Sequence, residues 1–524
     1  MTRPACLRLD PPASATLFSA LRQARALFGA QGGITDSNGH NTLAELHKRA
    51  LGAARIVARL TEPGETVGVL LPNVAGTVAA MIGAGAVGRV PALLNYTAGP
   101  EAINDACRAA QVRCIVTARA FVEKAGLEAL IARLDAPVHF IEDLRERLGL
   151  LDKLWIAAAL TAPGLLLPRG SREAPAVILF TSGSEGAPKG VVLSHRALLA
   201  NIAQVLDTLD VGPEQTVFNC LPVFHSFGLT AGSLLPLFAG MRCVLYVSPL
   251  HYKQIPGLIR EHQASILFGT NTFLANYAAH AAPGDFASLQ LVVAGAERLT
   301  DEVRQRWQHE FGIGILEGYG CTETAPVLAV NTPAHQRSGS VGRLLPGIEG
   351  RTVAVEGIER GGSLQVRGPN IMSGYLRATA PGVLEPPATA LGPGWYDTGD
   401  ICEIDADGYV FIRGRAKRFA KVAGEMVSLA LAEDLARHAR PDAQHAAARA
   451  PDRQRGERIV LFTTAQALQR QELAMAAHAL GVSELAIPRA IVPLESLPVL
   501  GTGKTDHQTL AAMALKLPDN HGSA

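Results

Sequence analysis

Short apolar, β-branched runs alternate with longer stretches of helical periodicity through the first 350 residues of the chain. A run of about four to eight such residues between turn signals is typical of a buried strand, and apolar positions three and four apart are typical of a helix. The predicted strands are 66–71, 114–117, 138–141, 176–180, 242–247, 265–268 and 291–294, and the clearest predicted helices are 43–60, 194–206 and 249–261. Strands and helices that alternate in this way build parallel sheets covered by helices. The pattern therefore predicts an α/β fold.

The texture changes beyond Gly347, where short strands and turns follow one another, as in GGSLQVRGP and GYVFIRGR. This predicts a small β-rich subdomain over about 347–413. Residues 414–524 hold 14 Lys and Arg against 11 Asp and Glu, whereas residues 1–413 hold 34 against 36, so the net charge changes sign there. We expect a large N-terminal domain, 1–413, of helix-covered parallel sheets with the β-rich subdomain, followed by a small C-terminal α+β domain, 414–524.

Composition and charge exclude several classes of protein. An apolar fraction of 48% and a charged fraction of 18% are those of an ordinary globular chain. A net charge of +1 gives no support for nucleic-acid binding. The seven cysteines are scattered without CxxC pairing, which argues against a zinc site and favours a reducing compartment. The first residues lack the continuous apolar stretch of a signal peptide, so we expect a cytoplasmic protein.

One segment, residues 154–168, contains fifteen residues without a charge. It is shorter than the ~20 residues that a membrane-spanning helix needs, and Pro163-Gly164 interrupts it. The interpretation favoured by that length is a buried helix followed by a turn. The alternative is a patch that rests on the inner face of a membrane, since basic residues flank the segment on both sides, with acidic residues among them.

The most informative stretch is the loop between two apolar strands at 181–190, TSGSEGAPKG. Glycines let backbone N–H groups turn inward on a polyphosphate, hydroxyls add donors, and Lys189 adds charge. A plain hairpin turn would need only two or three such residues. The loop therefore predicts phosphate binding. It is not a Walker A loop, and the similar stretch at 501–505 has Pro498 where that pattern requires glycine.

The loop is the first of five informative segments, which follow one another in this order: TSGSEGAPKG (181–190), GYGCTETAP (318–326), YDTGD (396–400), GRAKRFAKVAGE (414–425) and GTGKTD (501–506). With them in this order, the chain resembles the adenylate-forming superfamily of acyl-CoA synthetases, luciferases and peptide-synthetase adenylation domains. Within it, the chain is most similar to the acyl-[acyl-carrier-protein] synthetase half of the bacterial bifunctional 2-acylglycerophosphoethanolamine acyltransferase.

That closer likeness covers nearly the whole chain and is carried by LNYTAG (94–99), LPVFHSFGLT (221–230), VVAGAERL (292–299), GPNIMSGYL (368–376) and GRAKRFAKVAGEMVSL (414–429). The HxxxxD signature of the acyltransferase half has no convincing equivalent here. Acyl transfer to a lysophospholipid is therefore not predicted.

The resemblance implies a role for each residue of an ATP site. The loop would close over the β- and γ-phosphates, Glu323 would hold Mg²⁺, and Thr322 would contact the α-phosphate. Asp400 would accept hydrogen bonds from the ribose, although such an Asp on its own is also a common turn cap. The implied ATP-binding residues are Thr181, Ser182, Gly183, Ser184, Gly186, Lys189, Gly190, Gly295, Ala296, Glu297, Gly318, Tyr319, Gly320, Thr322, Asp400, Arg415 and Lys421. Of these, Tyr319 would stack on adenine, and residues 295–297 would line its edge.

The resemblance also places an acyl channel. His225 would line its entrance near the phosphates, although a lone His between two phenylalanines is more often structural. The implied walls are Phe224, Phe227, Phe268 and Phe273, with Gly269 letting the tail pass close to the backbone.

Lys504 would be the main catalytic residue, beside Thr322, Glu323 and His225. Its flexible ammonium can bridge the acyl carboxylate and the α-phosphate as negative charge builds. The C-terminal domain would be mobile, with its hinge at Lys417.

The predicted reaction is the ATP-dependent activation of a long-chain fatty acid to an acyl-adenylate. Transfer to the phosphopantetheine thiol of acyl carrier protein would follow, so AMP and pyrophosphate are released. Two alternatives stay open: an acyl-CoA synthetase that uses CoA as the acceptor, and a non-catalytic lipid-binding relative, against which Glu323, Asp400 and Lys504 argue together.

Overall fold

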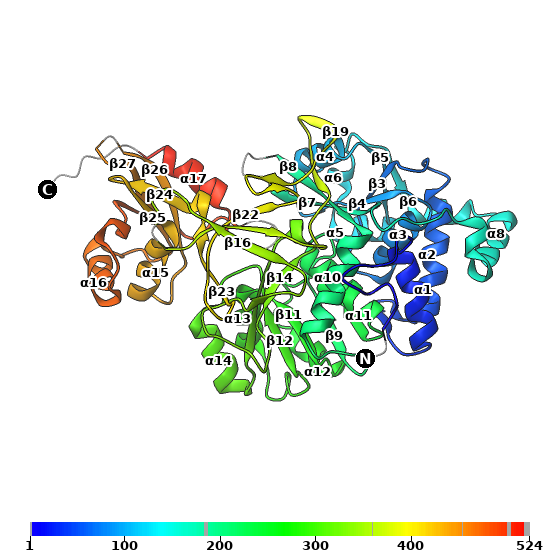
Figure 1. Ribbon diagram of the computed structural model, residues 1–524, viewed down its shortest axis with the longest axis horizontal. Helices are drawn as coiled ribbons and strands as arrows, with labels where there is room; N and C mark the ends of the chain where they lie inside the picture. The colour runs from blue at the N-terminus through cyan, green and yellow to red at the C-terminus, as the bar shows by residue number, and fades with distance from the viewer. Residues whose placement is uncertain (1–2, 183–186, 359, 453, 500–504, 518–524) are drawn as a thin grey trace. The chain divides into compact units, whose positions relative to one another are not determined.

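A computed structural model describes residues 3–182, 187–358, 360–452, 454–499 and 505–517 of the chain (Figure 1). The chain divides into two compact units, the first made of residues 1–349 and 367–396 and the second of residues 350–366 and 397–524. The larger unit is built on two mainly parallel sheets and the smaller one is α+β, so the predicted fold class is confirmed. The predicted boundary at 413/414 separates the N-terminal domain from a C-terminal domain that is expected to move, and it stays a prediction.

The first sheet of the larger unit has nine strands in the order β15-β14-β13-β12-β11-β9-β10-β1-β2. Neighbouring strands from β13 to β1 are parallel, whereas β14, β15 and β2 are antiparallel to their neighbours. The strands are β1 (Gly33–Asp36), β2 (Gly39–Asn41), β9 (Thr216–Asn219), β10 (Arg242–Leu245), β11 (Ile266–Gly269), β12 (Leu291–Ala294), β13 (Ile315–Gly320), β14 (Val327–Val330) and β15 (Arg343–Leu344).

The second sheet has eight strands in the order β19-β18-β8-β7-β4-β3-β5-β6. The strands from β7 to β6 are parallel, and the hairpin partner β8 and the strands β18 and β19 are antiparallel. The strands are β3 (Thr66–Val69), β4 (Val90–Leu93), β5 (Val112–Thr117), β6 (Val138–Phe140), β7 (Pro175–Ser182), β8 (Pro188–Ser194), β18 (Gly374–Arg377) and β19 (Ala380–Glu385).

Helices connect and cover these strands. They are α1 (Leu17–Phe28), α2 (Leu43–Val57), α3 (Ala75–Ala86), α4 (Pro100–Ala109), α5 (Arg119–Ala125), α6 (Glu128–Ile131), α7 (Ile141–Glu146), α8 (Leu150–Thr161), α9 (Pro163–Leu166), α10 (His195–Thr208), α11 (Leu235–Phe238), α12 (Ile255–Glu261), α13 (Asn271–His280) and α14 (Asp301–Phe311), with a π-helix at Phe227–Leu234 and a 3₁₀ turn at Thr322–Thr324. Helices α2 and α3 pack unusually close, since a Cβ added at Gly83 would lie 2.2 Å from the carbonyl oxygen of Ala50.

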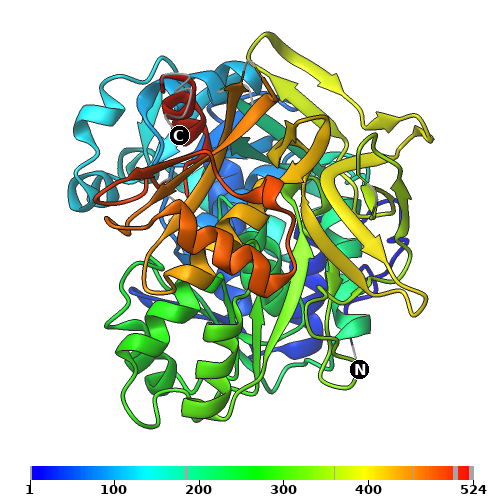
Figure 2. The same cartoon turned by 90° about the vertical axis from the view of Figure 1, so that its left-hand side faces the viewer.

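The smaller unit holds a four-stranded sheet, β16-β17-β22-β23, and a five-stranded sheet in which β25-β24-β27-β26 is extended by β28. Apolar clusters on both faces of the five-stranded sheet pack against α15 and α16 on one side and α17 on the other (Figure 2). The elements are β16 (Glu349–Val353), β17 (Gly362–Arg367), β22 (Tyr396–Ile404), β23 (Val410–Arg415), β24 (Phe419–Val422), β25 (Glu425–Ser428), α15 (Leu429–Ala439), β26 (His445–Asp452), β27 (Gly456–Thr463), α16 (Arg470–Leu480), β28 (Ala490–Pro493) and α17 (His507–Leu515), with 3₁₀ turns at Ala416–Arg418 and Glu484–Ala486. A short hairpin, β20 (Ala388–Thr389) and β21 (Gly392–Pro393), belongs to the larger unit.

All seven predicted strands overlap observed strands of the two large sheets. The predicted helix at 43–60 is α2, which a capping box between Thr42 and Glu45 starts, and the helix at 194–206 is α10, with Ser194 as its N-cap. The helix predicted at 249–261 begins only at Ile255, because Pro256 occupies its first turn. Proline is favoured there, where its missing N–H is not needed.

The interpretation of 154–168 as a buried helix and turn is wrong in one respect. The helix and the turn are present as α8 and α9, but most of their residues are exposed. One side of α8 packs on α2, where the buried Asp152 pairs with Arg55 and Arg59 at 2.8 Å, and the other side faces solvent. No helix in the described ranges has both the length and the apolar character needed to cross a bilayer.

Candidate active site

Four segments with predicted roles follow neighbouring parallel strands of the nine-stranded sheet. Gly269 ends β11, residues 295–297 follow β12, Gly318–Gly320 ends β13, and the segment around His225 follows β9. Because β13, β12, β11 and β9 are adjacent and parallel, their carboxyl ends share one edge of the sheet. Ligands of open α/β sheets bind at this edge. The residues that the sequence scattered over about a hundred positions are thus brought to one place.

The phosphate loop joins two central strands of the other sheet. Strands β7 and β8 form a hairpin with Thr181 opposite Lys189, and β18 adds Arg377 opposite Lys189 on the far side. Directly opposite residues share a face of the sheet, so Thr181, Lys189 and Arg377 lie on one face. Gly183, Ser184 and Gly186 lie outside the described residues, as does the side chain of Ser182.

Two cations surround one tyrosine on this face. The ammonium of Lys189 lies 5.6 Å from the centre of the Tyr375 ring, and the guanidinium of Arg377 lies 5.7 Å from it. Arg377 is also paired with Glu385 at 2.7 Å. Lys189 and Arg377 are like charges directly across the strand pair, and because Glu385 compensates Arg377, these three side chains together leave one net positive charge on this face. The arrangement suits a polyphosphate.

Tyr375 links this face to the carboxylate of Glu323. Its hydroxyl donates to Glu323 Oε1 at 2.6 Å and lies 3.4 Å from the hydroxyl of Tyr396. Burial, followed by the negative charge of Glu323, raises the pKa of Tyr375 far above its usual value, so the hydroxyl keeps its proton. The backbone is joined as well, since Met372 N–H donates to the Glu323 carbonyl at 2.8 Å. Glu323 is therefore held in one position by the segment 372–375.

Glu323 fits the implied magnesium role in a limited sense. Mg²⁺ that accompanies a nucleotide is usually held by one or two carboxylates together with phosphates and water. Among the described residues no cluster of three or more His, Cys, Asp or Glu could form an all-protein metal site. A single positioned carboxylate, Glu323, next to the face that carries Lys189 and Arg377 is compatible with a metal that arrives with a nucleotide, and the magnesium role of Glu323 stays a prediction.

Thr322 and the nearby glycines are held by contacts with other parts of the protein. The Ser226 hydroxyl donates to Thr322 Oγ1 at 3.3 Å, so the segment after β9 contacts the segment after β13. A Cβ on Gly320 would lie 2.0 Å from the Pro326 carbonyl oxygen, and one on Gly190 would lie 3.2 Å from Ile178 Cγ2. Packing thus requires glycine at 320, whether or not a ligand binds, while a larger residue at 190 would meet a tight but side-chain contact. Gly318 has ordinary contacts, the nearest at 3.5 Å.

The residues assigned to the adenine occupy the next strand ends. Tyr319 is buried in β13, opposite Ala329 of β14. Glu297 is already engaged, since it accepts a hydrogen bond from Thr272 N–H at 2.9 Å in the first turn of α13. Ala296 has φ +66°, a left-handed conformation that is rare for residues other than glycine, and it is exposed. Their contacts with a nucleotide stay predictions.

The aromatic residues of the predicted channel lie in three separate sets of ring contacts. The rings of Phe227 and Phe268 lie 5.6 Å apart, and a Cβ on Gly295 would come within 3.1 Å of Phe227. Phe224 instead packs edge-on against Tyr96 at 5.1 Å and beside His225 at 4.8 Å. Phe273 stacks on Tyr277 at 6.3 Å, and a Cβ added at Gly269 would lie 3.0 Å from Leu274. The aromatic residues therefore continue from the strand ends into the core.

In the smaller unit Asp400 is part of a strand. It lies opposite Arg415 in the β22–β23 pair and forms an ion pair with it at 3.1 Å. The turn before it is capped by other residues, since Asp397 accepts from Gly399 N–H at 2.8 Å. The Asp400–Arg415 pair places a carboxylate and a guanidinium side by side. The role of Asp400 toward a ribose stays a prediction, and a turn cap stays its alternative.

This unit has a run of basic residues, Arg413, Arg415, Lys417, Arg418 and Lys421, and three of them form internal ion pairs. Arg413 pairs with Glu403 and Arg418 with Glu433, each at 2.5 Å. Lys417 lies in the 3₁₀ turn after β23, and Lys421 is exposed on β24. Lys504 lies outside the described residues.

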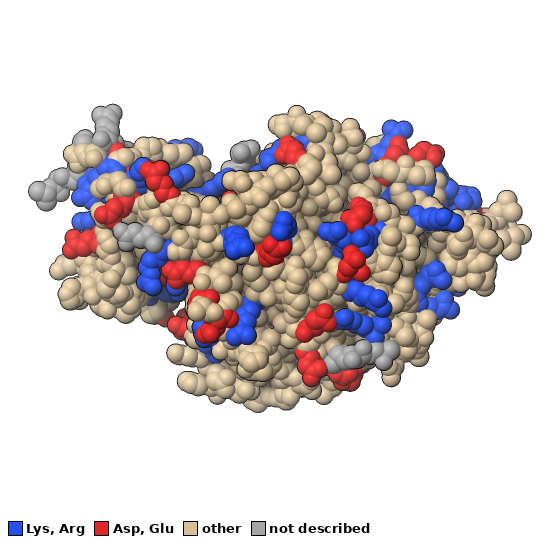
Figure 3. Space-filling model, viewed as in Figure 1, with Lys and Arg blue, Asp and Glu red and all other residues tan. Residues whose placement is uncertain are grey.

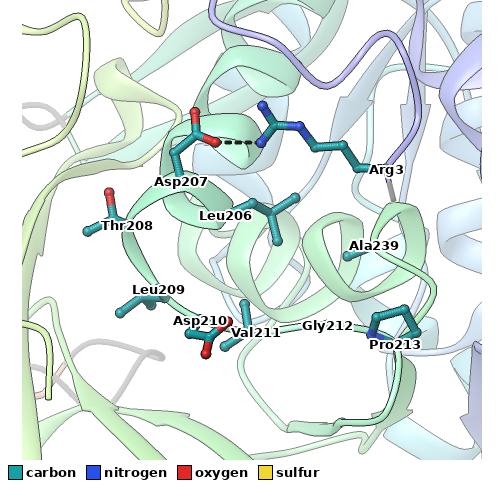
Figure 4. Close-up of a pocket in the computed structure, with 10 residues that line it drawn as sticks. All are labelled: Arg3, Leu206, Asp207, Thr208, Leu209, Asp210, Val211, Gly212, Pro213 and Ala239. Atoms are coloured by element: carbon teal, nitrogen blue, oxygen red, sulfur yellow. Dashed lines mark hydrogen bonds and ion pairs between the residues drawn. The ribbon is translucent and has the colours of Figure 1, made fainter. Parts of the chain in front are cut away.

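A cavity of 520 Å³ lies apart from all of these residues, at the end of α10 (Figure 4). Arg3 pairs with Asp207 at its rim at 2.6 Å. Its lining residues are Arg3, Leu206, Asp207, Thr208, Leu209, Asp210, Val211, Gly212, Pro213 and Ala239, none of which the sequence analysis singled out.

Sequence reasoning missed the two residues that join the site together, Tyr375 and Arg377. Tyr375 lies inside GPNIMSGYL, a segment that contributed only to the resemblance. Its partner Glu323 is 52 residues away and follows a strand of the other sheet. The one signal was the position of an aromatic residue and a cation, two apart, in the segment predicted to be rich in short strands.

Comparison with known proteins gives the context. The family model for AMP-binding enzymes matches residues 21–376. A long-chain-fatty-acid–CoA ligase of Salmonella typhimurium is 31% identical over 377 residues, which are 67% of this chain and 64% of that ligase. The match thus spans less than two thirds of that relative's length. A sulfoacetate–CoA ligase of Cupriavidus necator is 31% identical over 432 residues, covering 80% of this chain and 81% of the relative.

The fold has solved counterparts. The crystal structure of ATP-bound MatB from Rhodopseudomonas palustris superposes with a TM-score of 0.81 at 23% identity, covering 96% of this chain and 99% of that one. At this identity the likeness concerns the fold alone.

Proposed function

This chain belongs to the family of AMP-binding enzymes, and we propose that it activates a long-chain fatty acid as an acyl-adenylate and passes the acyl group to a thiol. The observation that carries the proposal is the Glu323–Tyr375 hydrogen bond, with Lys189 and Arg377 around the same ring. It joins a carboxylate at one sheet edge to a cationic face of the other sheet. The fatty acid is supported by the long-chain-fatty-acid–CoA ligases among the relatives.

The first step requires two anions to meet. A carboxylate oxygen of the acid attacks the α-phosphorus of ATP, a new P–O bond forms, and the bond to the β-phosphate oxygen breaks to release pyrophosphate. In our proposal Lys189 and Arg377 bind the β- and γ-phosphates, and Thr322 orients the α-phosphate. Mg²⁺ held by Glu323 would supply further positive charge to the phosphates.

Lys504 completes this step in the proposal by placing an ammonium between the acyl carboxylate and the α-phosphate. Asp400 and Arg415 hold the ribose. In the second step the thiol sulfur attacks the acyl carbonyl carbon and AMP leaves. A C-terminal domain that turns at Lys417 would remove Lys504 and admit the thiol, so that one site serves two reactions.

The proposal has two versions, which differ in the thiol that accepts the acyl group. The motifs at 94–99 and 414–429 favour the phosphopantetheine thiol of acyl carrier protein. The names of the relatives, which are CoA ligases, favour CoA. The internal pairing of Arg413 and Arg418 reduces the positive surface that the basic run offers to either acceptor. We place the reaction in the cytoplasm, which the seven free cysteines support.

One experiment tests the proposal. The purified chain is incubated with ATP, Mg²⁺, a series of fatty acids of increasing length, and either CoA or holo acyl carrier protein. AMP and a thioester that both depend on a long-chain acid support it, and the acceptor that yields the thioester decides between the versions. ADP as the nucleotide product, or AMP release that no fatty acid stimulates, would defeat it.

A further inference from the structure

Helices α8 and α9 carry an unusual concentration of exposed leucines. Among the described residues, sixteen large hydrophobic side chains are exposed, and five of them lie within the seventeen positions of 150–166. These are Leu150 (73%), Leu151 (77%), Leu154 (56%), Leu165 (86%) and Leu166 (38%). Exposed leucines scattered singly need no explanation, but a cluster marks an interaction site.

The leucines form a stripe because α8 is apolar on its outer side as well as on its inner side. Its exposed positions are 150, 151, 153, 154, 157, 158 and 161, and all of them are apolar except Lys153 and Thr161. Its inward side carries Asp152, which is buried and accepts from Arg55 Nε at 2.8 Å and from Gly149 N–H at 2.8 Å. The ion pairs of Asp152 with Arg55 and Arg59 hold the opposite side of α8 against α2, so the leucine stripe faces solvent.

Basic side chains border the stripe. Between 145 and 172 the chain has five basic residues and two acidic ones, Glu146 and Asp152. Arg172 pairs with Asp10, and Asp152 is neutralised by Arg55 and Arg59. The other four basic residues are exposed and form no ion pair with any residue that the structure describes; they are Arg145, Arg147, Lys153 and Arg169. In Figure 1, α8 lies at the right of the larger unit, and in Figure 3 the surface at this place consists of uncharged side chains with Lys and Arg next to them.

We infer that α8 and α9 dock this protein on the surface of an anionic lipid bilayer. Charge complementarity selects this occupant, since an apolar stripe with a basic border matches an acyl layer beneath negatively charged headgroups. Twelve residues of α8 extend about 18 Å, too short to cross the ~30 Å hydrocarbon layer, so the helix lies in the interface. The inference is independent of the reaction proposed above.

Vesicle flotation with the full chain tests the inference. Vesicles of phosphatidylcholine with phosphatidylglycerol are compared with vesicles of phosphatidylcholine alone. We expect the wild type to float with the anionic vesicles, and the variant Leu151→Ser/Leu154→Ser/Leu165→Ser to lose at least about tenfold in partitioning. The matched control, Leu250→Ser/Leu480→Ser/Leu515→Ser, removes three exposed leucines elsewhere and should bind as the wild type does. Melting temperatures of both variants establish that they fold.

Two further measurements test the contribution of the basic residues and the depth at which α8 enters the lipid layer. Lys153→Glu/Arg169→Glu should weaken binding to anionic vesicles only, and high salt should have the same effect. Trp155 lies half-buried on α8, so brominated lipids should quench wild-type fluorescence and should not quench Trp155→Phe. Wild-type protein that ignores both vesicle types would overturn the inference, as would equal losses in the two leucine variants. A dimer that the α8 leucine variant abolishes, without vesicle binding, would replace the bilayer with a second copy of the chain.

Discussion

Replacing Tyr375 with Phe removes one hydroxyl from the candidate active site and leaves the ring in place. That hydroxyl donates to Glu323 Oε1 at 2.6 Å, and Glu323 is only 8% exposed, so water is a poor substitute for the lost donor. A hydrogen bond to a charged group contributes about 1.5–3 kcal/mol. If the whole of it is expressed in the transition state, kcat/KM for MgATP falls about 10- to 150-fold.

The assay is fatty-acid-dependent ATP–pyrophosphate exchange with MgATP varied. Because burial and the charge of Glu323 raise the pKa of Tyr375 far above its usual value, the hydroxyl remains a donor at every working pH. The loss should therefore be the same from about pH 6 to about pH 9. Tyr396→Phe should lose less, since its hydroxyl is 3.4 Å from that of Tyr375 and makes no direct contact with the carboxylate in the described structure.

Tyr246→Phe is the matched control, because its hydroxyl donates to Gln254 at 2.6 Å in an exposed position. Exchange by Tyr375→Phe within about twofold of the wild type, with an unchanged melting temperature, would refute the reasoning. A drop in melting temperature that accounts for the whole loss would assign Tyr375 a purely structural role.

Four other outcomes follow from the same site and core. Lys504→Ala should nearly abolish adenylate formation while sparing thioester formation from supplied acyl-adenylate; normal exchange would contradict its assignment. Lys417→Pro should keep adenylation and lose thioester formation, and equal loss of both would argue against a hinge there. Burial lowers the pKa of His195 from 6.5 to about 4, so between these pH values the unfolded chain binds a proton that the folded chain does not. The free energy of unfolding should therefore fall by about 3 kcal/mol as pH drops from about 6.5 to about 4. In urea unfolding, the free energy of unfolding of His195→Gln should depend less steeply on pH over that window. Gly83→Ala should destabilise by about 1–3 kcal/mol in urea unfolding because its Cβ meets a backbone carbonyl, whereas Gly52→Ala, with nothing within 4 Å, should gain up to about 1 kcal/mol, and equal effects would show that the α2–α3 crossing can relax.

The strands of the two large sheets were predictable because burial on both faces leaves a continuous apolar run, as at 291–294. The exposure of α8 was not predictable by the same reasoning. An apolar run in the sequence indicates only that the segment is less stable in contact with water. The same run is expected whether the protein core or another apolar phase covers it. Only the position of Asp152, which pairs inward, decides which side of the helix faces out.

The candidate site was predictable in its parts and not in its connections. The loop at 181–190 has a local chemical reason, since glycines, hydroxyls and a lysine in ten residues suit phosphate. The Asp400–Arg415 pair depends on strand register, and the Tyr375–Glu323 bond depends on which strand β18 joins. Neither is a property of local spacing, because a one-residue slip in either strand would turn these side chains to the other face.

The bond between Tyr375 and Glu323 has a consequence for how distant changes reach the chemistry. Tyr375 belongs to the eight-stranded sheet and Glu323 follows a strand of the nine-stranded one, so the carboxylate is aligned by both. A core substitution that slides one sheet against the other by a few tenths of an ångström lengthens this bond without touching any ligand residue. The rate of the proposed reaction should thus depend on the alignment of the two sheets, and we expect slow variants from repacked cores as well as from the site itself.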